Sequence, residues 1–139
     1  MILLDTNVVS EVMRPAPSPK VLGWLDQRDA SDFFLSTISV AEIGFGLRIL
    51  PEGARRRTLS SRFQTFLRRG FGDRLLSFDA PAAEAYAELM AHRRRIGRPM
   101  SSLDGQLAAI ARSRNLAVAT RNLRDFEECG VELFDPFGP

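Results

Sequence analysis

Five short apolar runs, separated by stretches with helical spacing, constrain the fold of this chain more than any other feature. The runs are Ile2–Asp5, Phe33–Ser36, Leu75–Phe78, Leu116–Thr120 and Val131–Phe134. Continuously apolar strands are typical of parallel sheets that are covered on both faces. Strands that alternate with helices build such sheets. The sequence therefore predicts an α/β fold, a three-layer α/β/α sandwich around a mainly parallel five-stranded sheet.

Helices are expected between these runs because apolar residues recur there at spacings of three and four. The expected ranges are 8–13, 19–25, 40–50, 51–69, 82–96 and 103–114, with a short last helix after Asn122. Ser18, Ser39 and Ser101 stand where N-caps are expected. A loop or linker is predicted over 14–19, where three prolines remove backbone donors.

Length and composition indicate one soluble domain that spans residues 1–139, with 45% hydrophobic and 26% charged residues. No apolar run approaches the roughly 20 residues of a membrane span. A cytoplasmic protein is therefore expected. The single cysteine, Cys129, excludes an internal disulfide, and with the single histidine, His92, it cannot form a Cys/His zinc site. Any metal must bind to oxygen.

Three acids stand close to the ends of predicted strands. Asp5 ends the first strand, Glu42 follows the second, and Asp104 begins the helix that leads into the fourth. Ligands of open parallel sheets bind in the crevice beyond the carboxyl ends of the strands, so these acids are candidates for one site. The alternative is that each acid only caps a helix, because Ser39-x-x-Glu42 and Ser101-x-x-Asp104 both fit a loose capping box.

Carboxylates that gather in one crevice repel one another, so they must take up protons or bind a cation. With oxygen ligands alone, the expected cation is Mg²⁺ or Mn²⁺. Such an ion activates water and stabilises charge on phosphate oxygens, which suits phosphodiester hydrolysis. No serine, cysteine or histidine nucleophile is required.

Four motifs occur in one order along the chain. They are Ile2-Leu3-Leu4-Asp5-Thr6-Asn7, Ser39-Val40-Ala41-Glu42, Asp104-Gly105-Gln106-Leu107-Ala108-Ala109 and Ala119-Thr120-Arg121-Asn122-Leu123-Arg124-Asp125-Phe126. Together they resemble the PIN-domain ribonucleases of the VapC type, close to the FitB-like branch. The resemblance implies a PIN-like fold and a Mg²⁺- or Mn²⁺-dependent endoribonuclease. It further implies the toxin of a type II toxin–antitoxin pair, a homodimer that a small antitoxin inhibits.

The resemblance also implies roles for individual residues. By motif position, the metal-organising acids are Asp5, Glu42 and Asp104, and a nearby hydroxyl comes from Thr6 or Thr120. Asn122 stands where some members carry a fourth acid. Its carbonyl could bind metal or orient water, but it brings no charge, which weakens the case for a second tightly held metal. Asp125 either reaches this site or serves as a cap or a neighbour of Arg124.

Basic and aromatic residues leave two alternatives open. Eighteen of the nineteen basic residues are arginines, either because the partner carries phosphate or because of codon usage. The runs 55–57, 68–69 and 93–95 are expected to be solvated helix faces, and the alternative is a funnel for RNA. Trp24, Phe45, Phe63 and Phe66 are expected in the core, unless some lie exposed in a groove for a partner's amphipathic segment. His92 is expected at the surface, and Cys129 semi-buried near a turn.

Two other functions compete with RNA cleavage. The first is a catalytically weak PIN-like subunit that binds or regulates an antitoxin, because Asn122 lacks the fourth charge. The second is a phosphatase or phospho-acceptor domain, in which an aspartate ends the first strand. The phosphatase form needs an acid two residues later, where this chain has Asn7.

Overall fold

The computed structural model, which describes residues 1–138, contains the predicted parallel sheet. Its strands are β1 (Ile2–Leu4), β2 (Phe33–Ser36), β3 (Leu75–Leu76), β4 (Ala117–Ala119) and β5 (Leu133–Phe134). They lie in the order β3-β2-β1-β4-β5, and every pair is parallel. The third strand is shorter than predicted because its partner β2 turns into a helix after Ser36, so that no residue pairs beyond Leu76.

Every predicted helix is present, with shifted ends. The helices are α1 (Thr6–Val12), α2 (Pro19–Asp26), α3 (Thr37–Arg48), α4 (Ala54–Phe66), α5 (Ala80–Arg95), α6 (Ser102–Ser113) and α7 (Leu123–Phe126). A π-helical turn, Leu67–Phe71, continues α4, and 3₁₀ turns span Ala30–Asp32 and Gly72–Arg74. The expected start of α4 at residue 51 is wrong, because Gly53 takes the N-cap position with φ 151°, a conformation that favours glycine.

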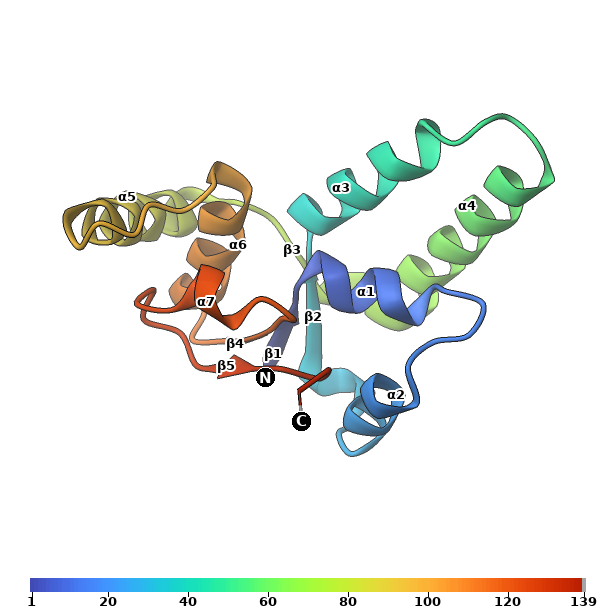
Figure 1. The fold of residues 1–139 in the computed structure, drawn as a ribbon, viewed down its shortest axis with the longest axis horizontal. Coiled ribbons are helices and arrows are strands. Elements are labelled where there is room, and N and C mark those ends of the chain that lie inside the picture. The colour runs from blue at the N-terminus through green and yellow to red at the C-terminus, as the bar shows by residue number, and fades with distance from the viewer. Residues whose placement is uncertain (139) are drawn as a thin grey trace.

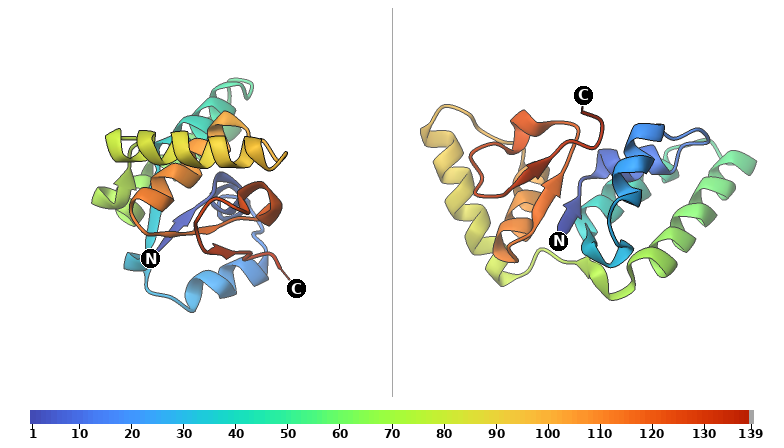
Figure 2. Two further views of the ribbon diagram at one scale, coloured as in Figure 1. Left: turned by 90° about the vertical axis from the view of Figure 1, so that its left-hand side faces the viewer. Right: turned by 90° about the horizontal axis from the view of Figure 1, so that it is seen from below.

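Two hydrophobic cores cover the two faces of the sheet, and successive strand residues point to them in turn. Leu3 packs with α5 and α6, whereas Ile2 and Leu4 pack with residues of α1 to α4. Figures 1 and 2 show α5 and α6 on one side of the strands and α1 to α4 on the other. This period of two with apolar residues on both faces explains the continuously apolar runs, and it confirms the three-layer sandwich.

The order of the strands places a crevice beside β1. The chain first builds the sheet outward from β1 through β2 to β3, and then returns to the other side of β1 to add β4 and β5. Ligands bind at such a switch point, beyond the carboxyl ends of the strands. Asp5 directly follows β1, and Thr120 directly follows β4. None of the helices in the described chain is long and apolar enough to cross a membrane.

The aromatic residues divide between core and surface. Phe63 is buried, and Trp24 packs against Phe33 and Phe134 with ring centroids 5.8 and 5.9 Å apart. The expectation that Phe45 belongs to the core is wrong, because 67% of this residue is exposed on α3. Cys129 lies deeper than predicted, at 1% exposure, in the core beneath α6 and α7.

Candidate active site

Asp5 lies at the switch point as predicted and is buried there. Its Oδ1 accepts the Thr6 backbone N–H at 2.7 Å, and its Oδ2 accepts the Thr120 hydroxyl at 2.8 Å. Its own N–H donates to the Ala119 carbonyl of β4 at 2.9 Å. Burial raises the pKa of Asp5 to about 6, and repulsion from Asp104 and Glu42 acts in the same direction, against the two hydrogen bonds. Asp5 is therefore both the N-cap of α1 and an acid in an electronegative site.

Glu42 is not part of a helix cap, so its capping interpretation is wrong. Helix α3 begins at Thr37, and its N-cap is Ser36, which accepts the Ser39 N–H at 3.1 Å. Glu42 therefore lies in the second turn of α3, and Ser39 is buried inside the helix. The Thr6 hydroxyl donates to Glu42 Oε1 at 2.8 Å and lies 2.9 Å from Ser39 Oγ. This contact joins the start of α1 to α3.

Asp104 is in the first turn of α6, as predicted, and its backbone N–H donates to the side chain of the N-cap Ser101 at 3.2 Å. Its side chain is half-buried. Burial raises the pKa of Asp104, and the nearby charges of Asp125 and Glu42 add to this effect. Asp104 therefore lies at the start of a helix, and its carboxylate is close enough to the other acids for their charges to raise its pKa.

Asn122 lies beyond β4 and at the start of α7. Its backbone N–H donates to the Thr120 hydroxyl oxygen at 3.0 Å, so Thr120 links this loop to Asp5. The Asn122 side chain is exposed and does not cap α7. Asp125 does not line the cleft that holds Asn122, and it acts on the site through the charge that raises the Asp104 pKa.

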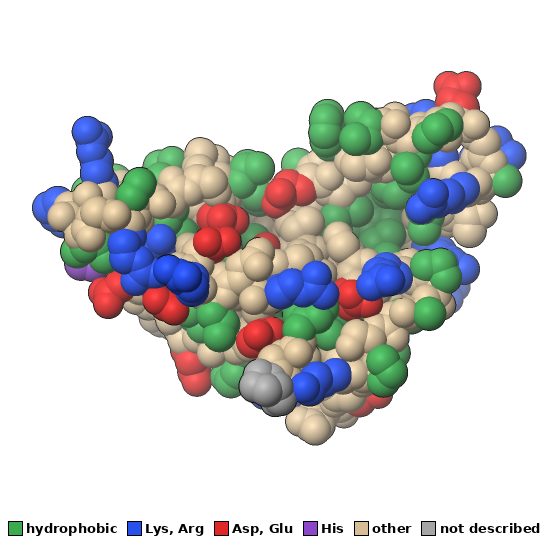
Figure 3. Space-filling view, in the orientation of Figure 1, with side chains coloured by type: hydrophobic (Ala, Val, Ile, Leu, Met, Phe, Trp, Pro, Cys, Tyr) green, Lys and Arg blue, Asp and Glu red, His purple; other side chains and the backbone are tan. Residues whose placement is uncertain are grey.

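One cleft of about 540 Å³ collects all four site residues that the sequence predicts. Its walls are formed by Asp5, Thr6, Asn7, Ser10, Glu11, Arg14, Glu42, Asp104, Arg121 and Asn122. In Figure 3, acidic side chains gather in the notch between the α3 and α6 sides of the molecule, with basic side chains beneath them. The cleft therefore has an acidic wall, consisting of Asp5, Glu42 and Asp104. It also has a basic wall, consisting of Arg14 and Arg121 with Glu11 between them, which the motifs did not predict.

The acidic wall suits a hard divalent cation that keeps its own water molecules. Its donors are carboxylate and hydroxyl oxygens. Burial, with a smaller contribution from the charges of Asp104 and Glu42, raises the pKa of Asp5, so the ionised form of Asp5 is destabilised and a cation would relieve this cost. Within residues 1–138, no three acid, histidine or cysteine side chains lie close enough together to hold a metal ion by themselves. Mg²⁺ is usually bound by one or two carboxylates together with waters and substrate phosphates, so an open arrangement fits this ion.

The basic wall is built on Glu11, a buried acid of α1. Arg14 Nη1 contacts both carboxylate oxygens of Glu11, at 3.2 and 3.3 Å, and Arg121 Nη2 lies 3.5 Å from Oε1. The Ser18 backbone N–H donates to Oε2 at 3.0 Å, which anchors the end of the proline-rich loop. This N–H, together with the two arginines, holds the pKa of Glu11 below its usual value.

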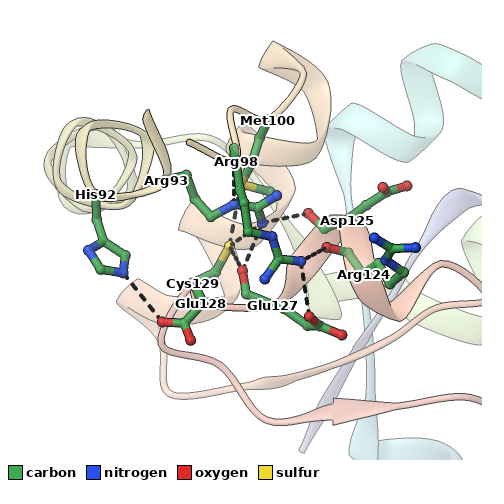
Figure 4. Close-up of polar contacts among 9 residues, drawn as sticks. All are labelled: His92, Arg93, Arg98, Met100, Arg124, Asp125, Glu127, Glu128 and Cys129. Carbon is green, nitrogen blue, oxygen red and sulfur yellow. Dashed lines mark hydrogen bonds and ion pairs between the residues drawn. The ribbon is translucent and has the colours of Figure 1, made fainter. Parts of the chain in front are cut away.

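Arg93 of α5 joins the segment that precedes α6, the helix of Asp104, to the segment around α7. The side chain is buried, so the prediction of a solvated face over 93–95 is wrong for this residue. Its Nε donates to the Arg98 carbonyl at 2.6 Å, and its Nη1 donates to the carbonyls of Asp125 and Glu127 at 3.1 and 2.7 Å (Figure 4).

Arg98 and Cys129 complete this connection. Arg98 Nη2 donates to the Arg124 carbonyl at 3.2 Å and to the Glu127 carboxylate at 3.0 Å. Arg93 Nη1 also contacts Cys129 Sγ, at 3.7 Å. The segment before α6 and the segment around α7 are thereby fixed to each other from behind the cleft.

Sequence reasoning missed Glu11 and Arg93, although each carried a signal. Glu11 is a lone acid within the apolar stretch of the first helix. Arg93 continues the buried stripe Ala82, Ala85 and Leu89 of α5 at a spacing of four. A charged residue on a buried helix face needs partners, and both residues have them in the structure. His92 is partly exposed as predicted, 3.4 Å from Glu128 Oε2.

Known proteins share this fold and most of the length of the chain. Residues 2–131 match the PIN domain family. Toxin FitB of Neisseria gonorrhoeae is 39% identical over 137 residues, which cover 99% of both chains. A VapC ribonuclease of Sinorhizobium fredii is 38% identical over 139 residues, covering 100% of this chain and 99% of its own.

Among solved structures, FitAB bound to a DNA fragment contains a chain that matches with a TM-score of 0.94 and 37% identity, covering 100% of this chain and 97% of that one. The topology, the acids at the switch point and these similarities agree with one another. They show that the chain belongs to the PIN-domain family, among the VapC-type and FitB-like toxins.

Proposed function

We propose that this protein is a Mg²⁺- or Mn²⁺-dependent endoribonuclease that acts as the toxin of a type II toxin–antitoxin pair. The observation that carries the proposal is the acidic wall: a buried Asp5 at the switch point, with Glu42 and Asp104 in the same cleft and close enough to raise its pKa. The ribonuclease activity of the VapC relative supports RNA as the substrate.

In the proposed mechanism, Asp5, Glu42 and Asp104 would hold the metal ion, and an ion bound there would supply an activated water and stabilise charge on the phosphate. The protein contributes position. Thr120 and the Thr6 N–H each occupy one oxygen of Asp5 and so fix the plane of its carboxylate. The Thr6 hydroxyl does the same for Glu42.

Asn122 has a different role from the three acids. Its side chain is exposed at the edge of the cleft and carries no charge. We assign to it the orientation of water or substrate through its amide, rather than the binding of a second metal.

An apolar groove beside the active site supports an antitoxin as the partner. It measures about 400 Å³ and is lined by residues in and next to α1, α3 and α4, among them Met13, Ile43, Leu47 and Leu59. Thr6 and Glu42 also line it, so a partner in this groove would lie next to the acidic wall. Phe45 of α3 and Ile49, which directly follows this helix, are exposed. An amphipathic segment of an antitoxin would cover such apolar surface and obstruct the cleft.

The remaining parts of the proposal concern domain organisation, assembly and location. We propose one nuclease domain over residues 1–139, because a single sheet carries both cores. A homodimer is the expected assembly, and light scattering on the purified protein would measure it. An RNA substrate also implies action in the cytoplasm.

The test of the function is cleavage of single-stranded RNA by purified protein with Mg²⁺ or Mn²⁺. Cleavage is expected to stop on addition of chelator, and to fall about 10³-fold in Asp5→Asn and in Asp104→Asn, because the metal supplies several kcal/mol of transition-state stabilisation. The matched control is Asp73→Asn, which removes the same charge from an exposed turn outside the cleft.

Two outcomes would contradict the proposal. In one, the wild-type protein binds an antitoxin but cleaves no RNA with either metal, which would favour the catalytically weak binding subunit. In the other, Asp5→Asn cleaves as fast as Asp73→Asn, which would remove the acidic wall from the chemistry.

A further inference from the structure

The basic wall of the cleft contains more positive charge than its buried acid can neutralise. Glu11 is the carboxylate that both Arg14 and Arg121 contact, so two guanidinium groups share one negative charge. Both arginines remain accessible, with 65% of the Arg14 side chain and 54% of the Arg121 side chain exposed. One net positive charge and several N–H donors are therefore left facing the cleft.

Two further contacts hold Arg121 in position and leave the N–H donors of its guanidinium free. Its guanidinium carbon lies 3.9 Å from the centre of the Phe137 ring, and its backbone N–H donates to Asn7 Oδ1 at 3.3 Å. Stacking on an aromatic ring orients the planar guanidinium without occupying its N–H groups. A guanidinium that is already fixed in this way loses little further conformational freedom when it binds a ligand.

The ligand that suits this wall is a phosphate. Arginine donates in a planar fork that matches two oxygens of a phosphate group. The cleft volume of about 540 Å³ lies within the range of roughly 300–1,000 Å³ that is usual for ligand sites. The acidic wall repels an anion when no cation is bound, so the substrate needs a basic surface that holds its backbone at the edge of the acids.

We propose that Arg14 and Arg121, held by Glu11, form a clamp for one phosphodiester group of the RNA next to the scissile bond. This inference rests on the proposed ribonuclease function, and it adds a substrate-binding pair to the metal-organising acids. Glu11 acts as a positioning residue, because it contacts the arginines and not the RNA. The clamp holds the backbone across the cleft, with the scissile phosphate facing the acidic wall.

The experiment measures the binding of a labelled single-stranded RNA in chelator, where no cleavage occurs, by fluorescence anisotropy over a series of salt concentrations. Arg14→Gln and Arg121→Gln are each expected to raise the Kd about tenfold, the cost of one hydrogen bond to a charged group. Each is also expected to lower the slope of log Kd against log salt by about 0.7, the value for one phosphate contact on a single strand.

The matched control is Arg95→Gln. Arg95 is an exposed arginine of α5 that lines a different cleft, with His92 and Glu128, so this variant removes the same net charge at a distance. It is expected to leave both the Kd and the salt slope close to the wild-type values. Arg121→Lys, which keeps the charge but loses the fork, is expected to recover only part of the binding.

The outcomes separate this inference from the function on which it rests. If the wild-type protein cleaves RNA but the two arginine variants bind it as tightly as Arg95→Gln, the clamp is wrong and the nuclease stands. If the wild-type protein neither binds nor cleaves RNA, the proposed function itself fails. Thermal unfolding of each variant shows whether a loss of binding comes from a loss of folded protein.

Discussion

Asp5 and Glu11 are two buried acids of one short segment, and their surroundings shift their pKa values in opposite directions. Asp5 precedes α1, and burial, with a smaller contribution from two nearby acids, raises its pKa to about 6. Glu11 lies near the end of α1 between two arginines and the Ser18 N–H, and its pKa is lowered. Both are less than a tenth exposed and both line the same cleft. Burial alone therefore does not determine which charge a site holds.

In the proposed nuclease, this difference lets α1 and the residues next to it contribute to both the metal-binding half and the phosphate-binding half of the site. The acids around Asp5 leave negative charge that is relieved by a proton or a cation. The arginines around Glu11 leave positive charge that is relieved by a phosphate. A backbone N–H group fixes each buried side chain: the Thr6 N–H binds Asp5, and the Ser18 N–H binds Glu11. The surplus charge of each wall lies on the residues that face the cleft.

The largest effect is expected from Arg93, the third buried charge, whose hydrogen bonds go to three carbonyls and a thiol. Arg93→Met leaves the carbonyls of Arg98, Asp125 and Glu127 without this donor. We expect the free energy of unfolding to fall by about 3 kcal/mol, since an unsatisfied buried polar group costs about 1–3 kcal/mol. Urea denaturation measures the change.

Arg94→Met is the control for this prediction, because Arg94 is exposed on the same helix. It is expected to change stability by no more than about 0.5 kcal/mol. Equal effects of the two substitutions would mean that the carbonyls find other partners. The comparison of Arg93 with Asp5 and Glu11 would then fail, because the stability that Arg93 provides would not depend on its buried partners.

Much of the fold follows from local pattern. The apolar runs predict all five strands, because each strand is covered on both faces and needs no polar alternation. The order β3-β2-β1-β4-β5 does not follow from these runs, because it depends on where each helix crosses the sheet. The start of α3 was misplaced for a local reason: both Ser36 and Ser39 can cap a helix, and the end of β2 selects Ser36.

The acidic wall was predictable and the basic wall was not. Asp5 and Asp104 follow from strand ends, helix caps and motifs. Glu11 and Arg121 are 110 residues apart in sequence and meet only because β4 lies beside β1. The same pairing of strands brings Thr120 to Asp5, a contact that spans 115 residues.

Asp5→Asn tests the acidic side of the comparison in the absence of metal. The folded pKa of about 6 lies above the ordinary value of 3.8, so ionisation of Asp5 opposes folding once the pH exceeds these values. We expect the variant to be more stable than the wild-type protein at neutral pH, by about 2 kcal/mol. The gain shrinks as the pH falls through 6 and is absent near 3.8. Thermal unfolding in chelator measures it.

For Glu11, the acid of the basic wall, we expect a stability change of the opposite sign. The folded pKa of Glu11 lies below its ordinary value of 4.5, so its ionised form stabilises the protein above that pH. Glu11→Gln keeps an oxygen for the Ser18 N–H but removes the charge between the arginines. The variant is expected to be less stable than the wild-type protein at neutral pH, by less than Arg93→Met. The gap closes as the pH falls through the lowered pKa, where the wild-type carboxylate is protonated as well.

Glu88→Gln is the control that distinguishes the ion pairs of the buried Glu11 from an ion pair at the protein surface. Glu88 Oε2 contacts Arg112 at 3.0 Å, a shorter contact than either arginine makes with Glu11, but 70% of the Glu88 side chain is exposed. Exposed ion pairs contribute little because water screens them, so Glu88→Gln is expected to unfold close to the wild-type temperature at every pH. A gap for Glu11→Gln that stays constant down to acid pH would mean that hydrogen-bond geometry, and not charge, maintains the basic wall. The opposite pKa shifts of Asp5 and Glu11 would then have separate origins.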